Sequence, residues 1–114
     1  MERVLRAALF FACLMVLILE YVDAGGDSPY RDWFEGLNAQ AAAKVTVALT
    51  RMVLGNLSNV KGVGAGVLEF RIDFGPGYRV YFGKDGDRLL ILLAGGTKAR
   101  QQKDIATAQQ RWVD

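Results

Sequence analysis

Basic and aromatic side chains alternate with apolar residues over positions 67–82, and this segment is the part of the sequence best suited to binding an anion. The polar positions hold Arg71, Arg79 and Tyr81, which provide two guanidinium groups and a phenol. Guanidinium groups bind phosphate oxygens through paired hydrogen bonds, and a phenol ring can stack on a base. The segment therefore predicts a surface suited to RNA.

Further cations could extend this chemistry to cleavage of a phosphodiester. Lys98 follows Gly95-Gly96-Thr97, a run expected to form a loop in which the glycines let the backbone approach a ligand. Lys98 could then converge with Arg71 and Arg79 on one phosphate. The two arginines would stabilise the pentavalent transition state, and Lys61 or Lys98, with its pKa lowered by neighbouring cations, is the candidate base.

Each of these residues also has a purely structural interpretation. Arg79 could form a cross-strand ion pair with Asp73, and Arg71 could form a cation–π pair with Tyr81. Lys61, in a loop, could simply be solvated. The residues alone thus predict an RNA-binding face and leave catalysis open.

Composition narrows the possible chemistry. A chain of 114 residues with a net charge of +2 forms one small domain. It contains no histidine and a single cysteine, Cys13, so a zinc site, a Ser-His-Asp triad and a Cys-His nucleophile are excluded. No metal or cofactor is expected. Basic residues of the second half predict a local basic groove, in which Arg100 and Lys103 are candidate RNA-binding residues.

A β-hairpin is expected to position the two arginines. Strict alternation over 68–74 and 78–82 puts the apolar side chains on one face and the polar ones on the other. A three-residue loop, Gly75-Pro76-Gly77, would close on Phe74 and Tyr78. In that register Arg71 lies opposite Tyr81, and Asp73 lies opposite Arg79.

Other patterns predict the elements around the hairpin. Residues 15–22 read as a first strand, Ser28-Pro29 starts a short helix, and residues 39–54 form a second helix with a core-facing stripe. Residues 89–93 are apolar at every position, which predicts an interior strand covered on both faces. Residues 101–113 form a last amphipathic helix. The order β-α-α-β-β-β-α predicts an α+β fold with an antiparallel-rich sheet of about four strands.

The amino terminus allows two interpretations. Arg3 and Arg6 precede an apolar run, which is the shape of a signal peptide or membrane anchor within residues 1–19. Alternatively, Met15 is the true start and residues 1–14 are an upstream extension of a domain spanning 15–114. Membrane association is expected only if residues 1–19 form an anchor, and the expected location is the cytoplasm.

Four ordered motifs resemble a known family. They are Gly-Asn-Leu-Ser-Asn-Val-Lys at 55–61, Glu-Phe-Arg-Ile-Asp-Phe-Gly-Pro-Gly-Tyr-Arg-Val-Tyr-Phe at 69–82, Leu-Leu-Ala-Gly-Gly-Thr-Lys at 92–98 and Gln-Gln-Lys-Asp-Ile-Ala at 101–106. Over residues 15–114 the chain is similar to the addiction-module killer proteins, which are HigB-like toxins of the RelE/ParE superfamily, also labelled phage-derived Gp49-like. The resemblance implies a RelE-like fold with helices packed on an antiparallel sheet.

The resemblance also implies a function and partners. HigB-like and RelE-like members cleave messenger RNA on the ribosome without a metal, and an adjacently encoded antitoxin neutralises them. When the motifs are aligned, the functional cations of these toxins correspond to Arg71, Arg79, Lys98 and Lys61. Asp104 stands about where RelE has a functional tyrosine, and the histidines of some HigB proteins are missing. The resemblance thus implies a ribosome-associated mRNA endoribonuclease, with a ParE-like gyrase inhibitor or an inactive toxin as the alternative.

Overall fold

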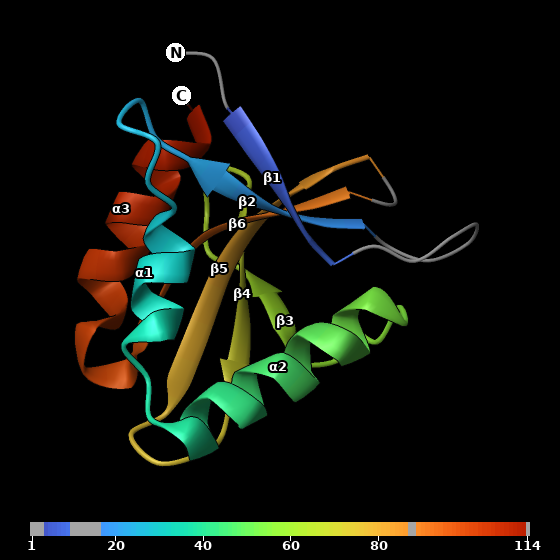
Figure 1. The fold of residues 1–114 in the computed structure, drawn as a ribbon, viewed down its shortest axis with the longest axis vertical. Coiled ribbons are helices and arrows are strands. Elements are labelled where there is room, and N and C mark those ends of the chain that lie inside the picture. The colour runs from blue at the N-terminus through green and yellow to red at the C-terminus, as the bar shows by residue number, and fades with distance from the viewer. Residues whose placement is uncertain (1–3, 10–16, 87–88, 114) are drawn as a thin grey trace.

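The computed structural model describes residues 4–9, 17–86 and 89–113, with β1 described by its backbone alone (Figure 1). Within these ranges the chain forms one sheet, three α-helices and a short 3-10 helix, η1. The elements are β1 Val4–Leu9, β2 Leu17–Val22, α1 Pro29–Glu35, α2 Ala39–Val53, β3 Val60–Gly62, β4 Val67–Ile72, β5 Tyr78–Asp85, β6 Leu89–Thr97, η1 Lys98–Arg100 and α3 Gln101–Val113.

The sheet is mixed, and its strand order is β1-β2-β6-β5-β4-β3. Strands β2 and β6 run parallel, whereas the other neighbours are antiparallel. The predicted α+β class is confirmed, but the count of about four strands is wrong. Two edge strands, β1 and the three-residue β3, were not predicted, so two strands rather than one precede the first helix.

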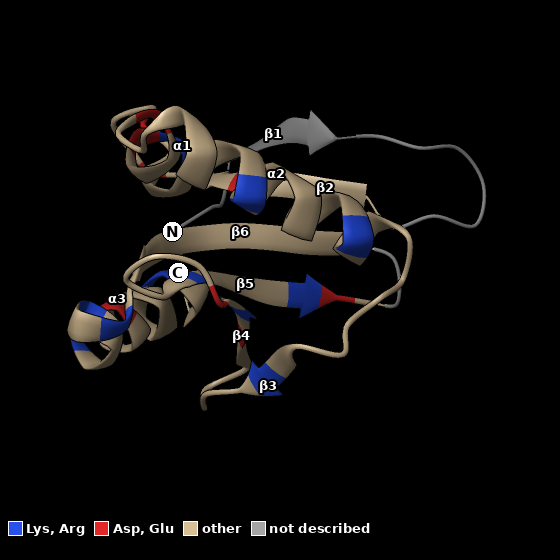
Figure 2. Ribbon diagram, turned by 90° about the horizontal axis from the view of Figure 1, so that it is seen from below, with Lys and Arg blue, Asp and Glu red and all other residues tan. Residues whose placement is uncertain are grey.

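Helices cover both faces of the sheet (Figure 2). Helices α1 and α2 lie on one face and α3 on the other. Strand β6 occupies the interior of the sheet, and its residues 90–93 are buried because each face meets a helical layer. The interior position expected from its unbroken apolar sequence is therefore confirmed.

The β4–β5 hairpin sorts its side chains as the alternation predicts, but its register differs. Ile72 pairs with Tyr78, which leaves a five-residue loop at 73–77 and sets Arg71 opposite Arg79. The loop is longer because Phe74 leaves the ladder: its N–H donates to the Ile72 carbonyl, and its side chain packs against the α2-side core. Gly75 and Gly77 supply the positive φ angles of 55° and 81° that this loop requires.

Gly95 and Gly96 do not form the predicted ligand-approach loop, because both belong to β6. A Cβ at Gly95 would lie 2.0 Å from the Trp33 ring of α1, and a Cβ at Gly96 would lie 1.9 Å from Asp104 Oδ2 of α3. Gly95 therefore makes room for Trp33 and Gly96 makes room for Asp104, so that α1 and α3 can pack close to the two faces of the sheet.

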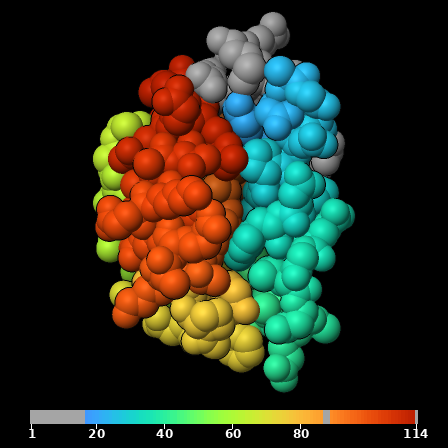
Figure 3. Space-filling view, turned by 90° about the vertical axis from the view of Figure 1, so that its left-hand side faces the viewer, coloured from blue at the N-terminus to red at the C-terminus, as the bar shows by residue number. Residues whose placement is uncertain are grey.

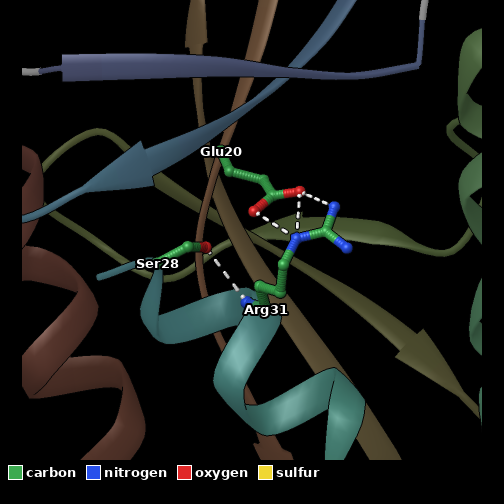
Figure 4. A network of polar contacts seen from close by, with 3 residues as sticks. All are labelled: Glu20, Ser28 and Arg31. Atoms are coloured by element: carbon green, nitrogen blue, oxygen red, sulfur yellow. Dashed lines mark hydrogen bonds and ion pairs between the residues drawn. The ribbon is translucent and has the colours of Figure 1, made fainter. Parts of the chain in front are cut away.

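A buried ion pair joins α1 to the sheet (Figure 4). Glu20 of β2 is fully buried, and Arg31 Nε donates to its two carboxylate oxygens at 3.0 and 3.1 Å, with a further bond from Nη2. The Arg31 backbone N–H also donates to Ser28 Oγ, which caps α1 as expected. Arg31 is thus held at both its backbone and its side chain.

None of the helices in the described ranges has the length and apolarity needed to cross a membrane. Residues 4–9 of the amino-terminal segment pair with β2 as an antiparallel strand. The start site predicted at Met15 lies outside the described residues.

Candidate functional site

A buried carboxylate, Glu69 of β4, is the centre of a polar cluster on the α3 face of the sheet. Only 1% of its surface is exposed. Its Oε1 lies 3.7 Å from Lys61 Nζ of β3 and 3.7 Å from Arg79 Nε of β5. Its Oε2 accepts a hydrogen bond of 2.8 Å from Gln101 Nε2 of α3. Sequence reasoning placed Glu69 on the polar face but gave it no role, since only the packing of α3 shows that it is buried.

Two arginines stand directly opposite each other next to this cluster. Arg71 of β4 pairs in register with Arg79 of β5, on the same face as Glu69. Like charges at opposed positions destabilise a sheet unless other groups compensate. Arg79 is compensated by Glu69, whereas Arg71 Nε lies 3.5 Å from the exposed carboxylate of Asp73. Neither the Asp73–Arg79 pair nor the Arg71–Tyr81 pair considered above is formed in this register.

The two guanidinium groups differ in exposure. The Arg71 side chain is 54% exposed, so it can meet a ligand directly. The Arg79 side chain is only 8% exposed and lies beneath the surface. Arg71 can therefore act by contact, and Arg79 chiefly by the charge that it contributes from below.

Lys98 and Arg79 both lie next to Gly77 of the hairpin loop. The Lys98 backbone N–H donates to the Gly77 carbonyl at 2.8 Å. A Cβ at Gly77 would lie 3.4 Å from Lys98 Cβ and 3.6 Å from Arg79 Nη1, so both side chains pass the same glycine. The yellow hairpin loop lies against the orange start of η1 and α3 in Figure 3. This junction brings the hairpin and the end of β6 into one site.

The remaining predicted cations lie around this junction. Arg100, in η1, is exposed and lies 3.8 Å from Asp104 Oδ1, and Lys103 is exposed on the first turn of α3. Lys61 is 65% exposed on β3, where its charged neighbour is the Glu69 carboxylate. That environment is not the cluster of cations that the predicted base role of Lys61 requires.

Tyr81 is not placed to stack on a base, which corrects the predicted RNA-binding role. The residue has no exposed surface, because α3 covers it within the second core cluster. Its hydroxyl is buried and makes no hydrogen bond to the described residues. Burial, together with the neighbouring Glu69 carboxylate, raises the pKa of Tyr81 far above its usual value. The ring is a packing residue, and its hydroxyl stays protonated at neutral pH.

Asp104 contributes a second enclosed carboxyl group. Its side chain is 13% exposed, and its buried Oδ2 has no hydrogen-bond partner among the described residues. Burial raises the pKa of Asp104, although the nearby Arg100 opposes this shift. Within residues 17–86 and 89–113, no cluster of three or more His, Cys, Asp or Glu side chains could hold a metal ion.

Comparison with known proteins identifies a family and a relative of this chain. The family model described as "Phage derived protein Gp49-like (DUF891)" matches residues 32–113. A protein of Haemophilus influenzae, described as an uncharacterized protein, is 42% identical over 81 residues, which make up 70% of this chain and 82% of its own. The chain belongs to the Gp49-like family of phage-derived proteins.

The Gp49-like match runs from α1 to the end of α3 and contains every predicted site residue. The family is that of addiction-module killer proteins, so this part of the resemblance is confirmed. The narrower assignment to HigB or RelE stays a prediction.

Proposed function

We propose that this Gp49-like chain is the toxin of a type II toxin-antitoxin module and that it cleaves messenger RNA on the ribosome. The observation that carries the proposal is the placement of Arg71, Arg79 and Lys98 at one end of the sheet. Each residue comes from a different element, and Arg79 lies opposite Arg71 and beside Lys98. Two opposed guanidinium groups repel each other, and an anionic ligand bound between them would relieve this repulsion.

In the proposed reaction the ribose 2′-oxygen attacks the adjacent phosphorus, and the bond from phosphorus to the 5′-oxygen breaks. The 2′-hydroxyl loses its proton and the departing 5′-oxygen gains one, which leaves a 2′,3′-cyclic phosphate and a 5′-hydroxyl. Negative charge builds on the phosphoryl oxygens in the transition state. Arg71 and Lys98 contact these oxygens, while Arg79 adds positive charge from beneath, a contribution that often dominates catalysis.

The partners follow from this role. Messenger RNA and the ribosome supply the substrate, and a cognate antitoxin, encoded next to the toxin, keeps the protein inactive. The proposed location is the cytoplasm, where both partners are found.

Arg71→Ala is the variant that tests this proposal most cleanly. Arg71 and its partner Asp73 are both exposed, so their ion pair adds little stability and the variant should stay folded. Loss of one group that stabilises transition-state charge lowers the rate by about 10²–10³-fold. Purified wild-type and variant proteins are compared on ribosomes programmed with messenger RNA, and the RNA ends are mapped. Lys84→Ala, an exposed cation at the far end of β5, is the control.

Induction in cells separates the proposal from its main competitor. A nuclease stops translation and leaves cuts within codons, and Arg71→Ala abolishes both effects. Filamentation with a DNA-damage response and intact messenger RNA would instead indicate gyrase inhibition and would refute the nuclease. Full toxicity of folded Arg71→Ala and Lys98→Ala variants would refute the site assignment.

A further inference from the structure

Two surface hollows lie near the end of β4, next to the proposed site. One has a volume of about 300 Å³ and lies between α2 and the end of β4. The other has a volume of about 150 Å³ and lies between β3 and β4. Asn59 and Arg71 line both hollows, so the two lie next to each other.

Four cations and two carboxylates line the two hollows, besides apolar residues. Lys44 and Arg51 project from α2, Lys61 from β3, and Arg71 lines both hollows. We call this surface the basic groove and define it by these four cations and Asn59. Figure 2 shows basic residues in blue on α2 and on β3.

The carboxylates of the basic groove offset the charge of Lys61 and Arg71 but not that of the α2 cations. Glu69 lies 3.7 Å from Lys61 and from Arg79, and it accepts a hydrogen bond from Gln101. Asp73 is exposed and lies beside Arg71 alone. Lys44 Nζ lies 5.2 Å from the centre of the Phe74 ring, and no ion pair involving Lys44 or Arg51 is present in the described part of the chain. These two α2 cations are therefore available to an external anion.

We infer that the basic groove binds the sugar-phosphate backbone of single-stranded RNA next to the cleaved phosphate. Arg71 belongs both to the groove and to the proposed site, so a strand held at Arg71 continues along Asn59 toward Arg51 and Lys44. The aromatic residues of the lining, Phe70 and Phe74, pack against the core, so the exposed cations are the groups that meet an RNA strand, and cations contact its backbone rather than its bases. This inference rests on the proposed function and assigns α2 a role in substrate binding that the sequence did not indicate.

Salt dependence of RNA binding provides the test. Lys44→Ala/Arg51→Ala is compared with wild type by fluorescence anisotropy, with a labelled 2′-O-methyl oligoribonucleotide that resists cleavage. Each phosphate contact contributes about 0.7 to the slope of log affinity against log salt for a single strand. The slope measured for the double variant should therefore be smaller by about 1.4. If the two proteins have the same RNA affinity at 1 M salt, this difference corresponds to about 25-fold weaker binding of the double variant at 0.1 M salt.

Two controls separate the groove from general charge. Lys44→Arg/Arg51→Lys keeps both cations and should keep the wild-type slope. Lys84→Ala removes an exposed cation outside the groove and should also leave the slope unchanged. All three substituted positions are exposed, so thermal unfolding should report similar stabilities for every variant.

The possible outcomes distinguish failure of this inference from failure of the proposed function on which it rests. If wild type cleaves ribosome-bound RNA and the double variant keeps the wild-type slope, the groove assignment is wrong and the proposed function stands. If the double variant loses antitoxin binding but keeps the slope, the groove serves an acidic protein segment and the inference is again overturned. If wild type neither binds nor cleaves RNA, both proposals fail.

Discussion

Replacement of Glu69 should destabilise the protein more than replacement of any exposed residue of the site. Its carboxylate is the counter-charge of Arg79, whose side chain is almost as buried. Removal of one partner from a buried ion pair costs about 3–5 kcal/mol, because the other charge is left uncompensated. The 3.7 Å separation exceeds hydrogen-bond distance, so we expect Glu69→Ala to cost about 3 kcal/mol, near the lower limit of that range.

Glu69→Gln separates the charge from the shape of the side chain. An amide can still accept the hydrogen bond from Gln101, so the substitution removes only the charge interactions with buried Arg79 and exposed Lys61, and we expect a loss of about 2 kcal/mol. At about 4 °C per kcal/mol for a domain of this size, Glu69→Ala should lower Tm by about 12 °C and Glu69→Gln by about 8 °C. Thermal and urea unfolding followed by circular dichroism measure both losses.

A double-mutant cycle tests the assigned cause. Glu69→Gln/Arg79→Gln removes both charges and should be at least about 1.5 kcal/mol more stable than the sum of the single losses predicts. Lys61→Ala serves as the control, because Lys61 contacts the same carboxylate from an exposed position and should change stability by less than about 0.5 kcal/mol. Equal losses for Lys61→Ala and Glu69→Gln, or strict additivity in the cycle, would refute the reasoning.

Three other predictions concern the layers around this cluster. Gly95→Ala should lower the unfolding free energy by about 1–3 kcal/mol, because its methyl group would overlap Trp33. Gly96→Ala should cost a similar amount through overlap with Asp104, and the double variant Gly96→Ala/Asp104→Ala should recover most of it. Equal stability of Gly96→Ala and this double variant would contradict the explanation. Because the folded state binds the Asp104 proton more tightly than the unfolded state, stability falls as pH rises above the usual aspartate range. Asp104→Asn should therefore have a higher Tm than wild type at pH 7, with a difference that shrinks on acidification, and a constant difference would exclude titration of Asp104 as the cause. Tyr81→Phe removes an unpaired buried hydroxyl and should leave both Tm and RNA cleavage within error of wild type, whereas a large loss of cleavage would restore its predicted contact with RNA.

The hairpin shows how far sequence reasoning reached. Its period of two fixed which side chains share a face, because that property depends on the backbone alone. The register depended on whether Phe74 stayed in the ladder or turned into the α2-side core, and only the tertiary packing decides this. A shift of two residues kept every face correct and still exchanged the partners of Arg71 and Arg79.

Sequence reasoning predicted the proximity of some candidate residues but not their surroundings. The sequence placed Arg71, Arg79 and Lys98 near one another, and the structure brings Arg79 beside each of the other two. The sequence alone could not show that α3 covers Tyr81 or that Gly95 and Gly96 allow the helices to pack on the sheet, since both facts depend on distant segments. Strand β3 has only three residues and gives no usable periodicity, so its pairing with β4 was missed.

The parallel pairing of β2 with β6 also constrains how this protein comes into being during translation. Leu17 pairs with Leu89, so the middle of the sheet closes only after most of the chain has been made, and contacts this distant in sequence form slowly. Lys98 and Gln101, which complete the polar cluster, are synthesised later still. A growing chain lacks the complete polar cluster until residues 98–101 have left the exit tunnel. The proposed toxin would therefore stay inactive for a time after its hairpin has emerged from the ribosome that makes it.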